Sequence, residues 1–323
     1  MKICVIGLWH LGLVTSVSLA KLGFNITCAD KSKEIENIKN LDLPINEKNL
    51  LNYFKKYKKN TKFQSIDEPF VKKNVFWLTN DTEVNDKDRI NYKQTLKDLI
   101  NISEKIPKNS IVIISSQIPV GTISKIEKNK ILKNKKHTFF YIPENLRLGN
   151  AINNFLKPDR IVIGTNTKNK NKIKTVKNIF KKLKCPIYLV SAETAEMSKH
   201  VINSFLACSI TFINEISQIS NKFKIDLNQL EETIKSDKRI GHKSYMNSGF
   251  SFSGGTLARD VNFLNDLFSK FNIKSKVIKN IILSNNYRKQ NIIKSILRLA
   301  KGRKRILQIG LTYKKGTNTM RRS

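Results

Sequence analysis

The sequence lacks the features of several protein classes. Cysteine is scarce and scattered, without a CxxC or metal-ligand spacing: the four residues are Cys4, Cys28, Cys185 and Cys208. This distribution excludes a disulfide framework and gives no basis for a metal site, and it favours reduced thiols in the cytoplasm. No apolar run reaches the length of a membrane span, and the first residues lack the basic region and cleavage site of a signal peptide. We therefore expect a folded cytoplasmic protein that does not contact membranes.

Acidic residues are also few, since 25 Asp and Glu stand against 60 Lys and Arg, for a formal net charge of +35. Such an excess is one signature of nucleic-acid binding. The lysines, however, are spread along the chain among Asn and Ile, as in TNTKNKNKIKTVKNIFKKLK (165–184). Lys, Asn and Ile share A/T-rich codons, so a genomic bias explains the mixture, whereas a dedicated site clusters its charge. We expect grooves that favour anionic ligands such as phosphates, with nucleic acid as the alternative partner.

The chain contains short apolar runs that alternate with helical patterns. The runs predict buried strands over 2–7, 25–30, 74–79, 110–116, 138–142, 160–164 and 186–190. Helices are expected between them, for example over 10–22, 92–104 and 168–183. This alternation predicts an α/β fold with a Rossmann-type, doubly wound parallel sheet. Beyond about residue 191 the pattern becomes helical, with one long helix over 194–221, until RILQIGLTY (305–313) predicts a further strand.

The first strand runs into a glycine turn, VIGLWHLG (5–12), and the second strand ends at Asp30. A dinucleotide fold uses such a turn to bring the cofactor pyrophosphate to a helix N-terminus, and an acid at this distance binds the ribose hydroxyls of NAD. Trp9, however, replaces the middle glycine, so an ordinary tight turn is an equal alternative. The cofactor contacts expected here are Gly7, Leu8, Trp9, His10, Leu11, Gly12 and Asp30.

Three other segments carry candidate chemistry. Lys199 and Asn203 lie four residues apart on the long helix and share a face among apolar neighbours. A partly desolvated ammonium there suits proton transfer or oxyanion stabilisation, and a lysine at the edge of a core is the plainer alternative. The loops YIPENLRLG (141–149) and SSQIPVGT (115–122) follow strands at the sheet edge where ligands bind, and simple polar turns are the alternative for both.

Together these segments resemble the nucleotide-sugar dehydrogenases, the family of the UDP-glucose, UDP-N-acetylmannosamine and GDP-mannose dehydrogenases. The likeness covers almost all of the chain, and its most specific parts are PENLRLGNAI with PDRIVIG, AEMSKHVINSFLA with INE, and RIG followed by GFSFSGGTLARD. The resemblance implies NAD as cofactor, a UDP-sugar as the substrate whose C6 alcohol is oxidised, a homodimer, and a role in surface polysaccharide biosynthesis.

The resemblance also implies a domain plan. The expected domains are an NAD-binding Rossmann domain over 1–192, a central helical domain for dimerisation and catalysis over 193–300, and the start of a UDP-sugar-binding domain over 301–323. We expect this third domain to be truncated, with Lys314 and Lys315 facing the nucleotide phosphates.

Site roles follow from the same resemblance. Glu144 is the acid near the sugar and the nicotinamide, Lys199 stabilises the developing oxyanion with Asn203 beside it, and Asp260 orients or activates water. Thr82, Ser116 and Gln117 lie beside NAD, and Glu83 stands where the family has a proline. Arg239 reaches a substrate across the dimer interface. The implied substrate contacts are Arg147, Lys199, Asn203, Arg239, Gly249, Phe250 and Gly255.

One position departs from the family in its chemistry. In GFSFSGGTLARD (249–260), Thr256 stands where the family carries its nucleophilic Cys, and Leu148 stands where many members have a second Glu. A threonine hydroxyl is far less ionised than a thiol near neutral pH, so we expect the covalent second oxidation to fail and the reaction to stop at the aldehyde. Oxidation of the aldehyde hydrate, with Lys199 and Asp260 moving protons, and an inactive NAD-binding protein are the alternatives.

Overall fold

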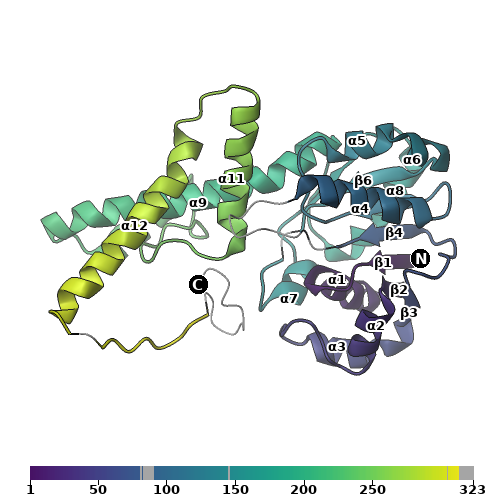
Figure 1. Ribbon diagram of the computed structural model, residues 1–323, viewed down its shortest axis with the longest axis horizontal. Helices are drawn as coiled ribbons and strands as arrows, with labels where there is room; N and C mark the ends of the chain where they lie inside the picture. Colours follow the sequence, from purple (N-terminus) through teal and green to yellow (C-terminus); the bar gives the residue numbers. More distant parts are fainter. Residues whose placement is uncertain (81, 83–90, 145, 304, 313–323) are drawn as a thin grey trace. The chain divides into compact units, whose positions relative to one another are not determined.

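A computed structural model gives the fold and describes residues 1–80, 82, 91–144, 146–303 and 305–312. The chain divides into two compact units, of which the first reaches Ser198 and the second begins at Lys199. The first unit combines a sheet with helices and the second is helical, which confirms the expected α/β class (Figure 1).

One eight-stranded sheet organises the first unit, in the order β3-β2-β1-β4-β5-β6-β7-β8. The strands are β1 (Lys2–Ile6), β2 (Asn25–Asp30), β3 (Thr61–Ser65), β4 (Val75–Leu78), β5 (Ile111–Ile114), β6 (Thr138–Tyr141), β7 (Ile161–Gly164) and β8 (Ile187–Val190). The seven strands expected in this unit are confirmed within two residues at each end. Strand β3 was not predicted, because Phe63 is the single apolar residue of this edge strand.

Helices cover both faces of this sheet. They are α1 (His10–Lys21), α2 (Ser32–Lys39), α3 (Leu50–Lys56), α4 (Tyr92–Lys105), α5 (Thr122–Lys128), α6 (Lys130–Lys135), α7 (Ala151–Leu156) and α8 (Lys170–Phe180), with short 3-10 helices at η1 (Lys58–Asn60) and η2 (Lys181–Leu183). Helix α1 ends where predicted, because Gly23 takes a left-handed φ of 89° and its N–H donates to the Ala20 carbonyl.

Each face of the sheet has its own hydrophobic core. Ile3 and Val5 of β1 belong to a cluster with residues of α1, α2, α3, α7 and α8. Cys4 and Ile6 of the same strand belong to a second cluster with α4, α5, α6 and the first turn of α9 (Ala192–Phe223). Successive strand side chains point to opposite faces, so a strand covered on both sides is apolar throughout. This is why short apolar runs located the strands.

The sequence predicted a parallel sheet, and this prediction is wrong for one pair of strands. Strand β7 pairs with β6 in the antiparallel sense, through Tyr141 and Gly164, whereas the other strand pairs are parallel. A parallel neighbour needs a crossover long enough to return the chain to the other end of the sheet. Between β6 and β7 the described residues form one short helix, the six-residue α7, and the chain makes no such crossover.

The second unit is built from long helices. The long helix predicted over 194–221 is confirmed as α9, which enters this unit at Lys199 and is followed by α10 (Leu227–Ser236), α11 (Gly255–Lys270) and α12 (Val277–Ala300). Ala207, Val261 and Ile281 form a small core where α9, α11 and α12 meet. None of the helices in the described part of the chain is long and apolar enough to cross a membrane.

The strand predicted over 305–313 is wrong for the residues that the structure describes. Residues 305–312 form neither helix nor strand, and the side chains of Leu307 and Ile309 are 85% and 90% exposed. An extended segment needs a neighbouring strand to satisfy its backbone, and no described strand pairs with this one. Tyr313, Lys314 and Lys315 lie outside the described residues.

A buried carboxylate joins α9 to α5. Glu196 is completely buried and accepts hydrogen bonds from the N–H groups of Gly121 (2.5 Å) and Ile123 (2.8 Å), at the start of α5. The first N–H groups of a helix have no partner within the helix, so this side chain caps it. Burial raises the pKa of Glu196 from 4.5 to about 7, and the backbone hydrogen bonds oppose this shift.

We expect Glu196 to make the stability depend on pH. Its carboxyl titrates at about 7 in the folded protein and near 4.5 when unfolded, so the folded form holds the proton more tightly. Its contribution to the stability of the folded protein is complete below about pH 4.5 and is lost as the pH rises through about 7. The shift corresponds to on the order of 3 kcal/mol of unfolding free energy. Denaturant titrations between about pH 5 and pH 8 should show a smaller loss for Glu196→Gln than for the wild type.

Glu193→Gln is the matched control. Glu193 lies one turn earlier on α9, and the Ser124 hydroxyl, which donates to it at 2.5 Å, lowers its pKa. Removing this group should not flatten the pH profile. If the stability of the wild type falls no more steeply with pH than that of Glu196→Gln, Glu196 is not the source of the pH dependence.

Candidate functional site

The turn between β1 and α1 has room only for glycine at its two ends. Gly7 has a φ of 92°, and a Cβ there would lie 2.9 Å from the Asn80 backbone nitrogen. A Cβ on Gly12 would lie 1.8 Å from the Gly7 carbonyl oxygen, so α1 approaches β1 as closely as backbones allow. The first N–H groups of α1 precede its first intrahelical bond, from Leu13 N–H to the Trp9 carbonyl, and the helix itself leaves them without acceptors.

Trp9 fits this turn without strain. Its φ of −73° and ψ of −166° are extended values that any residue adopts, and its side chain is 44% exposed. The middle position of the turn therefore does not need a left-handed backbone here. The replacement of glycine, which the sequence analysis counted against a dinucleotide site, leaves the turn geometry intact.

Asp30 lies beside this turn at the end of β2. Its Oδ2 accepts the Leu8 N–H at 2.5 Å, and its Oδ1 accepts the Lys31 N–H at 2.7 Å. The carboxylate is thus fixed next to the glycine turn, where an acid that binds ribose hydroxyls has to be.

The loops after β4 and β5 bring three further predicted residues together. The Thr82 hydroxyl donates to the Gln117 carbonyl at 3.0 Å. Ser116, between Ser115 and Gln117, is buried, and its hydroxyl has no hydrogen-bond partner among the described residues. A buried hydroxyl without a partner is costly, so it is suited to a ligand that supplies one.

Glu47 is a site residue that the sequence analysis missed. Its buried carboxylate accepts the N–H groups of Gly149 (2.8 Å) and Ala151 (3.0 Å) and lies 3.0 Å from His10 Nε2. It therefore ties the loop after β6 to the first residue of α1. No local pattern indicates this role, because the acid stands alone in a loop and its backbone partners Gly149 and Ala151 are about a hundred residues away in sequence.

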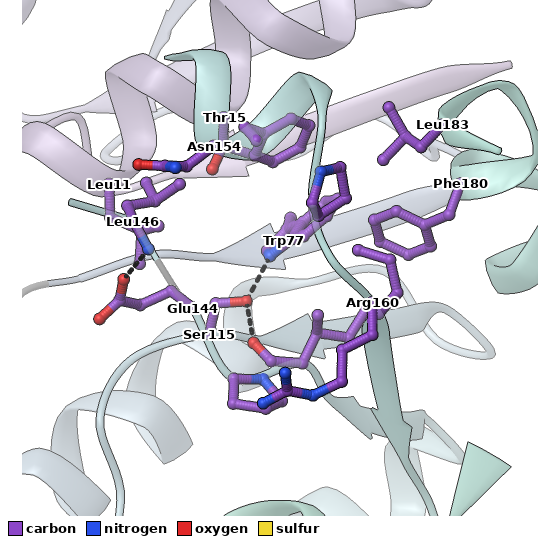
Figure 2. A pocket seen from close by; sticks show the side chains of 15 residues that line it. Leu11, Thr15, Trp77, Ser115, Glu144, Leu146, Asn154, Arg160, Phe180 and Leu183 are labelled. Atoms are coloured by element: carbon purple, nitrogen blue, oxygen red, sulfur yellow. Dashed lines mark hydrogen bonds between the residues drawn. The ribbon is translucent and has the colours of Figure 1, made fainter. Parts of the chain in front are cut away.

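Glu144 borders a cavity of about 60 Å³ inside the first unit (Figure 2). Its carboxylate accepts the Leu146 N–H at 2.9 Å. The Ser115 hydroxyl accepts the Trp77 indole N–H at 2.9 Å (Figure 2) and donates to the Ile142 carbonyl at 2.6 Å. Two polar atoms of the lining, Thr15 Oγ1 and Asn154 Oδ1, have no partner among the described residues, so buried water suits this small space. Arg147 is exposed on the same loop.

In the second unit, three polar side chains meet between α9 and α11. Asp260 is fully buried, with its Oδ1 2.7 Å from His200 Nδ1 and its Oδ2 accepting the Asn203 amide at 2.5 Å. Lys199, one turn before Asn203, is buried as well. Asn203 and Asp260 are therefore neighbours, and His200 is a further member of this cluster that was not predicted.

The glycine-rich loop leads into α11. Gly254 has a φ of 79° and precedes the helix, Gly255 is its first residue, and Thr256 is exposed in the first turn. No described residue hydrogen-bonds the Thr256 hydroxyl. Asp260 lies one turn further along the helix.

Two of the remaining predicted substrate contacts line a second cavity, of about 350 Å³, in this unit. Gly249 and Phe250 line it, and both are held through their backbones by Asn214, which accepts the Gly249 N–H at 2.8 Å and donates to the Phe250 carbonyl at 3.1 Å. Arg239 is exposed and pairs with Asp237 at 2.6 Å.

The predicted residues thus fall into two groups. Glu144 and the residues around the glycine turn belong to the first unit, and Lys199, Thr256 and their neighbours belong to the second. The expectation that both groups act on one substrate stays a prediction, and Glu83 lies outside the described residues. Within the described residues, no group of His, Cys, Asp or Glu could hold a metal ion, and all four cysteines are free.

Comparison with known proteins identifies two matching family models. Residues 1–184 match the NAD-binding domain of the UDP-glucose/GDP-mannose dehydrogenase family, and residues 193–287 match its central domain. The chain is 34% identical over 340 residues to UDP-glucose 6-dehydrogenase of Rickettsia bellii and 32% over 339 residues to that of Rickettsia felis. All of this chain is covered in both cases, with 76% and 74% of the relatives.

Solved structures show the same fold. A UDP-glucose dehydrogenase from Pyrobaculum islandicum superposes with a TM-score of 0.84 at 21% identity, over 93% of this chain and 71% of that one. A GDP-mannose dehydrogenase from Pseudomonas aeruginosa gives a TM-score of 0.66 at 23% identity, over 100% of this chain and 76% of that one.

The glycine turn makes an unusual prediction about stability. In a helix, Gly→Ala normally stabilises by about 1 kcal/mol, but Gly12→Ala should destabilise by roughly 1–3 kcal/mol because its Cβ meets the Gly7 carbonyl. Gly249→Ala is the control, since no atom lies within 4 Å of a Cβ there. It should change the free energy of unfolding by less than about 0.5 kcal/mol. Denaturant unfolding measures both, and a stabilised Gly12→Ala protein would show that α1 does not approach β1 this closely.

Proposed function

The chain belongs to the UDP-glucose/GDP-mannose dehydrogenase family, an NAD-dependent class of nucleotide-sugar dehydrogenases, and we propose that it oxidises the C6 alcohol of a UDP-sugar and stops at the aldehyde. The reaction converts the alcohol and NAD⁺ into the aldehyde, NADH and one proton. The exposed hydroxyl of Thr256, without a hydrogen-bonded base, carries the proposal that no second oxidation follows.

The residues of the first unit fit NAD. The turn from Gly7 to Gly12 supplies a backbone that a pyrophosphate can approach at the start of α1, and the Asp30 carboxylate lies beside it for the ribose hydroxyls. Thr82, Ser116 and Gln117 are assigned to the nicotinamide side, where the unpartnered Ser116 hydroxyl is the clearest sign of a missing ligand atom. When bound, NAD accepts the hydride from C6.

The remaining residues are assigned to the sugar. Lys199 is buried, so its ammonium acts in a medium where charge is poorly screened, and this suits it to stabilise the oxygen as the hydroxyl proton leaves. Glu144 and Arg147 are assigned to the same substrate from the loop after β6. Gly249, Phe250 and Gly255 are assigned to the nucleotide sugar in the second unit, and the large positive charge of the chain favours an anionic diphosphate.

Thr256 limits the chemistry to one hydride transfer. A thiolate in its place would attack the aldehyde, and loss of a second hydride would give a thioester that water cleaves to the acid and the free thiol. A hydroxyl does this only when a base takes its proton. His200, the one imidazole on α9 and α11, is held by Asp260 at 2.7 Å.

We propose a homodimer through α9. Five exposed apolar side chains form one stripe on this helix, at spacings of four and seven residues: Val201, Phe205, Phe212, Ile219 and Phe223. Such a stripe suits the same stripe on a second copy, which would bury both. In the proposed dimer, the exposed Arg239 of one subunit contacts the substrate bound to the other subunit. A cytoplasmic role in surface polysaccharide biosynthesis is proposed from the resemblance alone.

The Thr256→Cys variant tests the one-step reaction. The wild type should form one NADH per UDP-sugar consumed and accumulate the aldehyde. In the variant, the thiol stands in the first turn of α11, where a helix N-terminus lowers the pKa of a thiol, so we expect two NADH per sugar and the uronic acid. Absorbance of NADH against total sugar turned over, with product identification by mass spectrometry, gives the ratio.

Ser253→Cys is the matched control, because it places a thiol three residues earlier and outside the helix, and it should leave the ratio at one. Two NADH per sugar from the wild type would refute the one-step proposal. Binding of NAD without turnover of UDP-glucose, UDP-N-acetylmannosamine or GDP-mannose would instead indicate an inactive member of the family.

The dimer proposal predicts that charge in the stripe separates the subunits. A Phe205→Lys/Phe212→Lys protein should sediment as a monomer at concentrations where the wild type is a dimer, because both side chains are exposed within one chain and their loss costs it little packing. Phe271→Lys, at an exposed position after α11, should leave the wild-type sedimentation unchanged. A wild type that is monomeric at tens of micromolar would disprove the proposed interface.

A further inference from the structure

His200 and Asp260 form a pair closed off from solvent. The two residues are 1% and 0% exposed, and His200 Nδ1 lies 2.7 Å from Asp260 Oδ1. The other carboxylate oxygen of Asp260 accepts the Asn203 amide at 2.5 Å. A buried carboxylate requires such donors, because removing a charge from water without them is strongly unfavourable. Both oxygens of Asp260 therefore point in directions fixed by α9.

The imidazole is held on its flat side as well. The Phe263 ring, three residues after Asp260 on α11, lies 4.0 Å from it between centroids, with an angle of 31° between the planes. The ring thus contacts α11 through a hydrogen bond and through stacking. Since Nδ1 faces a carboxylate, it carries a proton in both the neutral and the charged form of the ring.

This contact connects the two helix faces that carry the predicted sugar-binding groups. Asn203 lies one turn after Lys199 on α9, and Asp260 lies one turn after Thr256 on α11. The bonds from His200 and Asn203 to Asp260 fix these faces relative to each other. A slip of α11 along α9 would break both bonds at once.

We propose that His200 is a positioning residue of the dehydrogenase site: its imidazole orients the Asp260 carboxylate, and through it the Asn203 amide, toward the C6 oxygen of the sugar. This role rests on the proposed function. The oxidation of the alcohol involves no covalent bond between the protein and the reacting carbon, so the polar groups of α9 and α11 set the orientation of this carbon. Misplacing such groups by about 1 Å can cost a factor on the order of 100 in rate.

Two substitutions separate this role from simple packing. His200→Phe keeps a flat ring against Phe263 but removes the donor to Asp260. His200→Asn gives up the stacking but places an amide nitrogen close to the position of Nδ1, so it restores the donor. A purely structural histidine would be replaced better by Phe, whereas an orienting donor would be replaced better by Asn.

The variants are compared by steady-state kinetics of the full chain with NAD. The sugar substrate is UDP-glucose, UDP-N-acetylmannosamine or GDP-mannose, whichever the wild type oxidises. Rates are divided by the folded fraction from circular dichroism. We expect His200→Phe to lower kcat by roughly 10- to 100-fold with KM within about 3-fold, and His200→Asn to recover most of kcat. Without any ligand, proton NMR of the wild type should show a strongly downfield Nδ1 proton, as a short charge-assisted hydrogen bond produces, and His200→Phe should lack it.

Three outcomes would overturn the role. An active wild type with an equally active His200→Phe variant would show that the imidazole orients nothing. A His200→Asn variant as slow as His200→Phe would show that the donor is not what matters. A rate loss that disappears after correction for the folded fraction would leave His200 with a structural role alone. A wild type that oxidises no nucleotide sugar would instead refute the proposed function, and that result needs neither variant.

Discussion

Hydrogen bonds from backbone N–H groups to buried carboxylates hold the loops of both units in place. Glu47 accepts two N–H groups at the start of α7, Glu196 two at the start of α5, and Glu231 accepts the Ser248 N–H in the loop before α11. A buried carboxylate must find donors, and the unbonded N–H groups of helix starts and loops supply them. Although the chain has 60 basic side chains, three of its 25 acidic residues bind backbone N–H groups at these buried positions.

Each of these bonds positions a segment that the proposed chemistry uses. Glu196 sets the start of α5, directly after the loop of Ser116 and Gln117. Glu47 sets the loop that begins at Glu144 and links it to His10 in the glycine turn. Loops at the carboxyl edge of a sheet are otherwise free to vary, because the sheet holds only their ends. Buried acceptors give these loops a defined shape without adding a hydrophobic core.

Local patterns in the sequence located what depends on local physics. Strands covered on both faces are apolar throughout, so seven of them were visible as short runs, and the glycine turn with Asp30 was visible from spacing. The features that were not predicted depend on partners far away in the sequence. Phe63 alone did not mark β3, whose edge position needs few apolar residues, and Glu47 meets residues more than a hundred positions away. The run at 305–312 has the pattern of a strand, but a pattern cannot supply the neighbour that a strand needs.

The contrast between Trp9 and Thr256 shows which departures from a family pattern matter. At position 9 the family motif needs a backbone shape, and an extended tryptophan with a partly exposed side chain provides it, so the departure leaves the turn unchanged. At position 256 the motif needs a chemical property, the low pKa of a thiol at a helix N-terminus, and no backbone shape can confer that on a hydroxyl. The helix start is present, and so is the carboxylate one turn later. The fold therefore keeps the electrostatic setting of a nucleophile at a position where the side chain cannot use it, and for this reason the proposed reaction ends one oxidation early.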